Sequence, residues 1–113
     1  MITIYGISTC STVKKAIKFC KENNLEHTFV DFRKTPLEDS KIDQFLNQIP
    51  LEKLFNPKGQ KYKELGLKEL NLDDSGKIEW LKKENMLFKR PIVQYKNKAL
   101  VSFNEQEYKR ELL

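Results

Sequence analysis

The order of elements expected along the 113-residue chain predicts an α/β fold. Three observations lead to this prediction: a strand–helix–strand unit opens the chain, only helices are expected in the middle, and a strand–strand–helix unit closes it. Strand–helix–strand units join parallel strands by a right-handed crossover. The order is that of the thioredoxin-like fold, a four-stranded mixed sheet, here with a helical insertion. We expect one domain over residues 1–113, with the insertion at about residues 35–85.

The first unit is indicated by a change of hydrophobic period near residue 11. Residues 2–5 are a β-branched and aromatic run, which Gly6 ends, and this predicts a strand. From Ser11 the apolar residues follow a helical period, with lysines on the other face. Residues 28–32 predict a second strand. The two strands should therefore be parallel.

The middle of the chain carries helix start and stop signals. Thr35 and Glu38 match a capping box with proline at the first helical position, which predicts a helix start there. Gly66 is expected to end a second, short helix. The run Asp73-Asp74-Ser75 can cap a third helix that continues to about residue 83.

The last part predicts a hairpin followed by a helix. Residues 91–95 and 99–101 are strand-like and are separated by turn residues. Asn104 with Glu107 three residues later predicts the cap of a final helix that runs to residue 113.

Composition excludes several classes of function. Lys and Arg number 21 against 16 Asp and Glu, a net charge of +5, but the two signs alternate along the chain, which favours a solvated surface over nucleic-acid binding. Two cysteines and one histidine give no zinc pattern, so no metal is expected. Without an apolar run of membrane-spanning length or a leader segment, we expect a cytoplasmic protein.

Cys10 is the candidate nucleophile. It follows a strand and a short loop and directly precedes a helix, where unpaired N–H groups and a partial positive charge stabilise a thiolate. Thr9, Ser11 and Thr12 add hydroxyl donors, and Lys14 adds positive potential. The alternative is an ordinary half-buried cysteine.

Cys20 is expected to be a core residue. It lies on the apolar stripe of the helix, and ten helical residues separate it from Cys10 by ~15 Å, beyond disulfide reach. The Arg90–Pro91 dipeptide opens a strand, where a cis proline would face the helix that carries the thiol. The backbone before Pro91 could then pair with a peptide-like ligand, and the Arg90 guanidinium could hold a carboxylate or an oxyanion. The alternative is an edge-strand proline beside a solvated arginine.

These landmarks together resemble the arsenate reductase (ArsC)/Spx family, over essentially the whole chain. The matching segments are Thr3-Ile4-Tyr5-Gly6, Cys10 with residues 12–16, residues 64–67 and residues 89–93. The opening is most similar to the YffB-like subgroup, which is proposed to contain glutathione-dependent thiol reductases. The resemblance implies a catalytic Cys10, a ligand site near it, and glutathione or glutaredoxin as partner, with no bound cofactor.

Departures from the family pattern separate the subgroups. Glutaredoxin-coupled arsenate reductases surround their cysteine with three arginines, of which only Arg90 is present here; Asn56 and Ser102 stand at the other two positions, and Gly6 replaces a histidine. Spx regulators, which bind RNA polymerase, carry a Cys-x-x-Cys pair, and Val13 replaces its second cysteine. The candidate binding residues are Thr9, Ser11, Thr12, Lys14, Asn56, Arg90 and Pro91.

We therefore expect a monothiol reductase in which Cys10 forms a mixed disulfide with glutathione or with a substrate. Two alternatives remain open: a glutaredoxin-dependent arsenate reductase, and an Spx-like regulator that binds the α subunit of RNA polymerase without catalysis. No membrane or direct nucleic-acid partner is expected.

Overall fold

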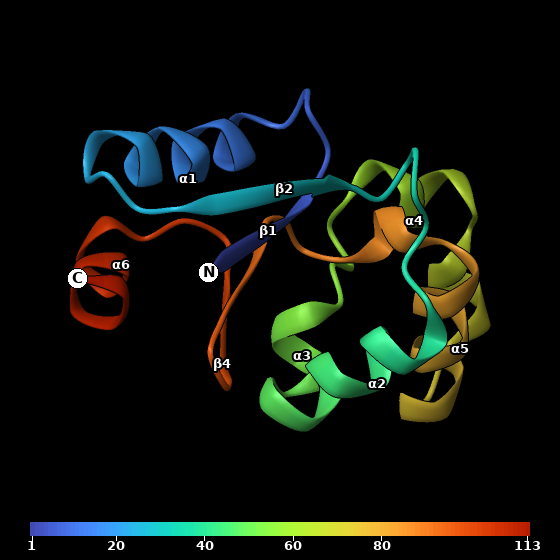
Figure 1. The fold of residues 1–113 in the computed structure, drawn as a ribbon. Coiled ribbons are helices and arrows are strands. Elements are labelled where there is room, and N and C mark those ends of the chain that lie inside the picture. Colours follow the sequence, from blue (N-terminus) through green and yellow to red (C-terminus); the bar gives the residue numbers. More distant parts are fainter. The chain divides into compact units, whose positions relative to one another are not determined.

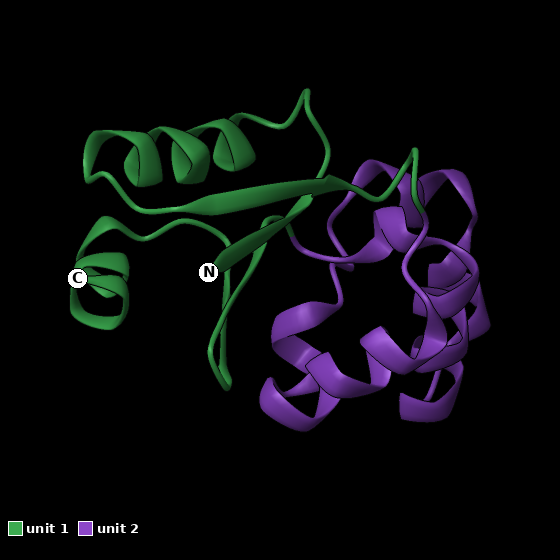
Figure 2. Ribbon diagram, viewed as in Figure 1, with its two compact units in different colours: residues 1–35, 90–113 green, residues 36–89 purple.

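The computed structural model describes residues 1–113, which form two compact units (Figures 1 and 2). The first unit comprises Met1–Thr35 and Arg90–Leu113, and the second comprises Pro36–Lys89. The second unit extends past the expected end at about residue 85, because the short 3-10 helix η2 (Asn85–Leu87) belongs to it. None of the helices has the length and apolar character needed to cross a membrane.

A mixed four-stranded sheet forms the centre of the first unit. Its strands are β1 (Ile2–Gly6), β2 (His27–Asp31), β3 (Ile92–Tyr95) and β4 (Lys98–Val101), in the order β2-β1-β3-β4. β1 and β2 are parallel, whereas β3 is antiparallel to both β1 and β4. The predicted α/β fold and its parallel first strand pair are confirmed.

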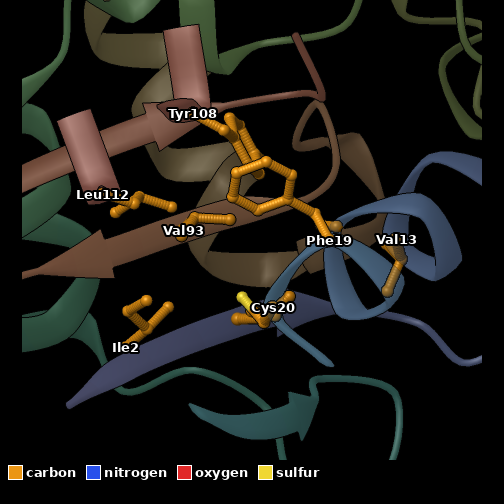
Figure 3. Close-up of a cluster of buried hydrophobic side chains, with 9 residues drawn as sticks. Ile2, Val13, Phe19, Cys20, Val93, Tyr108 and Leu112 are labelled. Carbon is orange, nitrogen blue, oxygen red and sulfur yellow. The ribbon is translucent and has the colours of Figure 1, made fainter. Parts of the chain in front are cut away.

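Two helices cover one face of this sheet, α1 (Ser11–Glu22) and α6 (Glu105–Leu112). Ile4 of β1 pairs with Val93 of β3, so both side chains lie on the same face. Phe19 and Tyr108 meet edge to face above it, with ring centroids 5.5 Å apart (Figure 3). The buried cluster consists of Ile2, Ile4, Val13, Ala16, Phe19, Cys20, Val93, Tyr108 and Leu112. Its membership confirms Cys20 as a core residue.

The second unit is entirely helical. It contains α2 (Asp39–Gln48), α3 (Leu51–Leu54), α4 (Gln60–Glu64), η1 (Leu67–Leu70), α5 (Asp74–Lys83) and η2. Phe45 and Phe88, both fully buried, pack edge to face at 6.5 Å. Gly66 has a φ of 64°, as expected of a residue that ends a helix in the left-handed region. The Asp73 carboxylate accepts from the Gly76 N–H at 2.8 Å, which confirms the predicted cap of α5.

The expected helix start at Thr35 is wrong. Helix α2 begins at Asp39, and Glu38 precedes it without a side-chain capping bond. The backbone N–H of Leu37 donates instead to the side-chain oxygen of Asn85, at 2.8 Å. Asn85 is buried, and its amide nitrogen donates to the Leu81 carbonyl oxygen. A buried amide needs such partners, so a tertiary hydrogen bond holds residues 35–38 out of the helix.

Candidate active site

Cys10 occupies the N-cap position of α1, directly before Ser11. The loop that connects β1 to α1 turns tightly here, since the Cys10 N–H donates to the Ile7 carbonyl oxygen at 3.3 Å. The first bond of the helix is made by the Lys14 N–H, which donates to the Cys10 carbonyl oxygen at 3.1 Å. The thiol therefore lies at the positive end of the helix, as the sequence predicts.

Several donors converge on the sulfur of Cys10. The Thr12 hydroxyl oxygen lies 3.1 Å from Sγ. Burial raises the pKa of the Cys10 thiol, but hydrogen bonds from the Thr12 hydroxyl, the Val13 and Thr12 N–H groups and the Arg90 guanidinium lower the pKa, and the net direction is down. These groups donate to the anion and favour it over the neutral thiol. Cys10 is thus placed to be a thiolate more readily than a free thiol is.

The Arg90–Pro91 segment approaches the same helix terminus. Its peptide bond is cis, as expected. The Thr12 hydroxyl donates to the Arg90 carbonyl oxygen at 3.0 Å, which connects the first turn of α1 to the residue before Pro91. The Pro91 carbonyl oxygen accepts from the Ser102 N–H at 2.8 Å, so the end of β4 holds this segment from the other side.

Gly6 allows α1 to approach the end of β1. A Cβ atom at residue 6 would lie 2.6 Å from Cγ2 of Val13, a distance that real Cβ contacts do not reach. Val13 is fully buried on α1, so it has little room to move. The structure therefore has no space for a histidine at this position.

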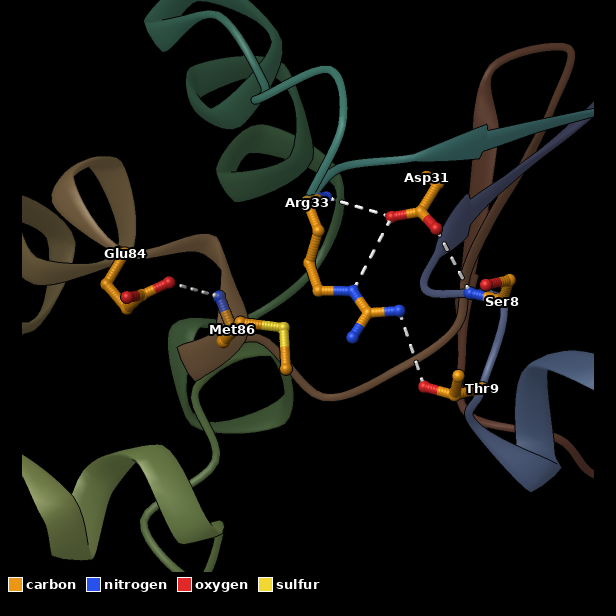
Figure 4. Close-up of polar contacts among 6 residues, drawn as sticks. All are labelled: Ser8, Thr9, Asp31, Arg33, Glu84 and Met86. Atoms are coloured by element: carbon orange, nitrogen blue, oxygen red, sulfur yellow. Dashed lines mark hydrogen bonds and ion pairs between the residues drawn. The ribbon is translucent and has the colours of Figure 1, made fainter.

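Arg33 is a residue of this region that the sequence reasoning missed. Its Nη2 donates to the Thr9 hydroxyl at 3.4 Å, and its Nε lies 3.9 Å from Oδ1 of Asp31 (Figure 4). The Asp31 carboxylate also accepts from the Ser8 and Arg33 N–H groups, at 3.3 and 3.0 Å. Burial raises the pKa of Asp31, but these donors and the positive charges of Arg33 and Lys34 lower it overall.

A sequence signal for Arg33 did exist. The carboxyl ends of parallel strands meet at one edge of a sheet, so a residue that follows β2 lies near the loop that follows β1. That loop contains Thr9 and leads to Cys10. In the sequence alone, Arg33 has no feature that distinguishes it from a solvated surface arginine.

The remaining candidate residues divide between the two units. Thr9, Ser11, Thr12, Arg90 and Pro91 lie with Cys10 in the first unit. Ser11 and Lys14 are exposed on α1. Asn56 lies in the second unit, where its side-chain oxygen accepts from the Lys58 N–H at 3.1 Å and closes the turn before α4.

Known proteins match nearly the whole chain. The ArsC family model matches residues 5–110. An uncharacterized protein of Haemophilus influenzae is 38% identical over 96% of both chains. An arsenate reductase of Neisseria meningitidis serogroup A is 29% identical over 88% of both chains. The global transcriptional regulator Spx of Lactococcus lactis subsp. cremoris is 26% identical, in an alignment that covers 95% of this chain and 83% of the Spx chain.

A solved structure extends the comparison to the fold. The protein YffB superposes with a TM-score of 0.91 at 23% sequence identity, over 100% of both chains. At this identity the likeness concerns the fold alone. The thioredoxin-like arrangement expected from the sequence is therefore confirmed.

Proposed function

Since the chain belongs to the ArsC family, we propose that it is a monothiol reductase whose Cys10 forms a mixed disulfide with glutathione or with a substrate. The observation that carries the proposal is the convergence of donors on one sulfur atom. The Thr12 hydroxyl, two backbone N–H groups and the Arg90 guanidinium all favour the Cys10 thiolate. The thiolate is the form that attacks a disulfide.

The first step is thiol–disulfide exchange. The Cys10 thiolate attacks one sulfur of a disulfide, a new sulfur–sulfur bond forms, and the old one breaks to release a thiolate. The step is redox-neutral, because one disulfide and one thiolate replace another disulfide and thiolate. The Arg90 carbonyl oxygen, which accepts from the Thr12 hydroxyl, belongs to the backbone segment before Pro91 that we propose pairs with a peptide-like substrate.

The second step needs a thiol from outside the chain. Cys20 is fully buried in the core on α1, and ten helical residues place it ~15 Å from Cys10 along the axis. That separation exceeds the span of a disulfide. A second glutathione, or a glutaredoxin, is therefore the thiol that resolves the mixed disulfide and restores Cys10.

Arsenate reduction is the second candidate function. A relative named arsenate reductase and the guanidinium of Arg90 beside Cys10 favour it. Arsenate carries more than one negative charge near neutral pH and depends on several convergent positive charges. Asn56 and Ser102 supply none, and each missing charge-assisted hydrogen bond costs about 1.5–3 kcal/mol. Thiol–disulfide exchange has no such requirement.

An Spx-like regulatory role is the third candidate, and the relative named Spx favours it. The residue three positions after Cys10 is Val13, which is fully buried. A Cys-x-x-Cys redox switch is therefore absent from this helix. A regulatory role would rest on binding of the RNA polymerase α subunit alone.

The test is the intact mass of the purified protein after incubation with oxidised glutathione. We expect one added glutathione, mapped to Cys10 by peptide analysis, and its removal by reduced glutathione or glutaredoxin. The Cys10→Ser variant should acquire none, and the Cys20→Ala variant should react like the wild type. Absence of an adduct, together with capture of the RNA polymerase α subunit, would favour the regulator.

A further inference from the structure

We propose that Arg33 is the carboxylate-binding residue of this site and holds a carboxylate of glutathione beside Cys10. The inference rests on the proposed monothiol reductase function. It goes beyond that function because it names a residue and a ligand group outside the segments that match the family motif.

Asp31 holds the backbone of Arg33 in a fixed relation to the loop before Cys10. The same carboxylate accepts from the N–H of Ser8 in that loop and from the N–H of Arg33 (Figure 4). The Asp31 side chain is only 8% exposed. The Ser8 bond therefore ties the end of β2 to the loop that follows β1, and the Arg33 bond fixes the turn directly after β2.

The two terminal nitrogens of the Arg33 guanidinium can bind a carboxylate. The ion pair with Asp31 uses Nε alone, at 3.9 Å, which leaves the two terminal nitrogens outside the pair. One of them donates to the Thr9 hydroxyl at 3.4 Å, a long bond that a carboxylate can replace. The side chain is 44% exposed, so a ligand can reach it. The ion pair with Asp31 therefore uses only part of the Arg33 guanidinium, and the two terminal nitrogens remain accessible to a ligand.

The position of Arg33 suits a carboxylate that lies one residue from the reacting sulfur. Thr9, whose hydroxyl accepts from Arg33, directly precedes Cys10. The C-terminal glycine of glutathione places its carboxylate one residue beyond the cysteine. The planar guanidinium binds a carboxylate through two parallel N–H bonds. A disulfide that carries such a carboxylate is thus the class of substrate that Arg33 selects.

Arg33 acts on binding, and the sulfur chemistry is left to Cys10. In the exchange step the Cys10 thiolate bonds to one sulfur of oxidised glutathione, and the second glutathione leaves as its thiolate. Arg33 bonds to the carboxylate of the glutathione that stays. Its removal should weaken the reaction with glutathione and leave the reaction with an uncharged disulfide unchanged.

The experiment compares two disulfides on three proteins. Rates of mixed-disulfide formation at Cys10 are measured with oxidised glutathione and with the uncharged bis(2-hydroxyethyl) disulfide, for the wild type, Arg33→Gln and the control Arg110→Gln. Arg110 is an exposed arginine of α6 that pairs with Glu111 at 3.6 Å. We expect Arg33→Gln to react about tenfold more slowly with oxidised glutathione, the factor to which 1.4 kcal/mol corresponds. Its rate with the uncharged disulfide should match the wild type, and Arg110→Gln should match it with both.

Two outcomes overturn the inference while leaving the proposed function intact. Wild-type rates with both disulfides in Arg33→Gln would show that Arg33 binds no carboxylate of glutathione. An equal loss with both disulfides shows that Arg33 only supports the loop. The Arg33→Lys variant, which keeps the charge without the fork, should give an intermediate ratio and serves if Arg33→Gln unfolds. A wild type that captures neither disulfide contradicts the proposed function itself, and the inference with it.

Discussion

The hydroxyl of Thr12 donates to the carbonyl oxygen of Arg90, a residue 78 positions later, at 3.0 Å. The same hydroxyl oxygen lies 3.1 Å from Sγ of Cys10. A hydroxyl has one hydrogen, so at any moment it can donate either to the Arg90 carbonyl or to a Cys10 thiolate, but not to both. In the neutral thiol, the S–H can donate to the Thr12 oxygen while the Thr12 hydroxyl donates to Arg90. A thiolate can only accept, so we expect ionisation of Cys10 to turn the Thr12 hydrogen toward the sulfur.

Replacement of Thr12 by valine should therefore slow the reaction of Cys10. The change removes a hydrogen bond to the thiolate, which is worth about 1.5–3 kcal/mol for a charged group. We expect the pKa of Cys10 to rise and alkylation at pH 7 to slow about tenfold. Thr12→Ser keeps the hydroxyl and is the matched control. Equal alkylation rates for the wild type and Thr12→Val would contradict the role given to this hydroxyl.

The alkylation rate of Cys10 should follow pH with a midpoint below that of a free thiol. Burial opposes the anion, but the Thr12 hydroxyl, the two N–H groups and Arg90 outweigh it. The measurement is the rate of iodoacetamide labelling against pH, with glutathione as the reference thiol. A midpoint that matches the reference would remove the basis for a nucleophilic Cys10.

The same pKa change makes stability depend on pH with a definite sign. Because the thiol pKa is lower in the folded state, the unfolded chain binds more protons between the folded pKa and the ordinary thiol value. The contribution of Cys10 to the free energy of unfolding should therefore rise with pH across that window and be lost as pH falls through the folded pKa. The difference between wild type and Cys10→Ser isolates it, because Cys20 is common to both.

Cys20 should resist alkylation until the protein unfolds. Its side chain is fully buried with Phe19 and Tyr108, and burial also raises the pKa of its thiol. We expect the Cys10→Ser variant to show slow labelling in the native state and complete labelling in denaturant. Labelling of Cys20 at the rate of a free thiol under native conditions would contradict its place in the core.

Local signals explain why most elements could be predicted. The β-branched run at the start of the chain and the Asn104 cap of α6, whose side chain accepts from the Glu107 N–H at 2.9 Å, depend on neighbours in sequence. Cys10 was recognisable because a strand and a helix flank it closely. The position of Cys20 followed from the helical period alone.

The misses depend on partners far away in sequence. The capping box at Thr35 does not form because Asn85, 48 residues after Leu37, accepts the Leu37 N–H. Arg33 reaches the loop before Cys10 only because β1 and β2 are adjacent and parallel. The helices η1 and η2 are short 3-10 segments with too few residues to show a period. Each of these features needs the three-dimensional arrangement.

Gly6→Ala should destabilise the protein. The added methyl group would lie 2.6 Å from Cγ2 of the buried Val13, so the end of β1 and the start of α1 must move apart. We expect a loss of about 1–3 kcal/mol in the free energy of unfolding, the usual cost of overpacking. In a double-mutant cycle, Val13→Ala should relieve part of this cost. A Gly6→Ala variant as stable as the wild type would show that the contact is easily relaxed.

Arsenate turnover by the wild type should be poor, and added arginines should raise it. Of the three arginine positions of the glutaredoxin-coupled reductases, only that of Arg90 holds an arginine, since Asn56 and Ser102 occupy the other two. Ser102 is the better place to begin, because its N–H donates to the Pro91 carbonyl oxygen and its backbone thus lies against the segment that carries Arg90. Asn56→Arg loses the side-chain bond to the Lys58 N–H as well as gaining a charge.

We therefore expect Ser102→Arg to increase arsenate turnover and the double variant with Asn56→Arg to increase it further, each added charge-assisted bond being worth about 1.5–3 kcal/mol. The measurement is arsenite formation with glutathione and glutaredoxin supplied, beside the rate of glutathione capture by Cys10. Ser102→Gln is the control of similar size without charge. Ser102 has a φ of 64°, a strain that arginine and glutamine share with serine, so the backbone does not bias the comparison. Wild-type turnover that equals an efficient three-arginine reductase would contradict the monothiol assignment, because the charge that arsenate requires would then be supplied without those arginines.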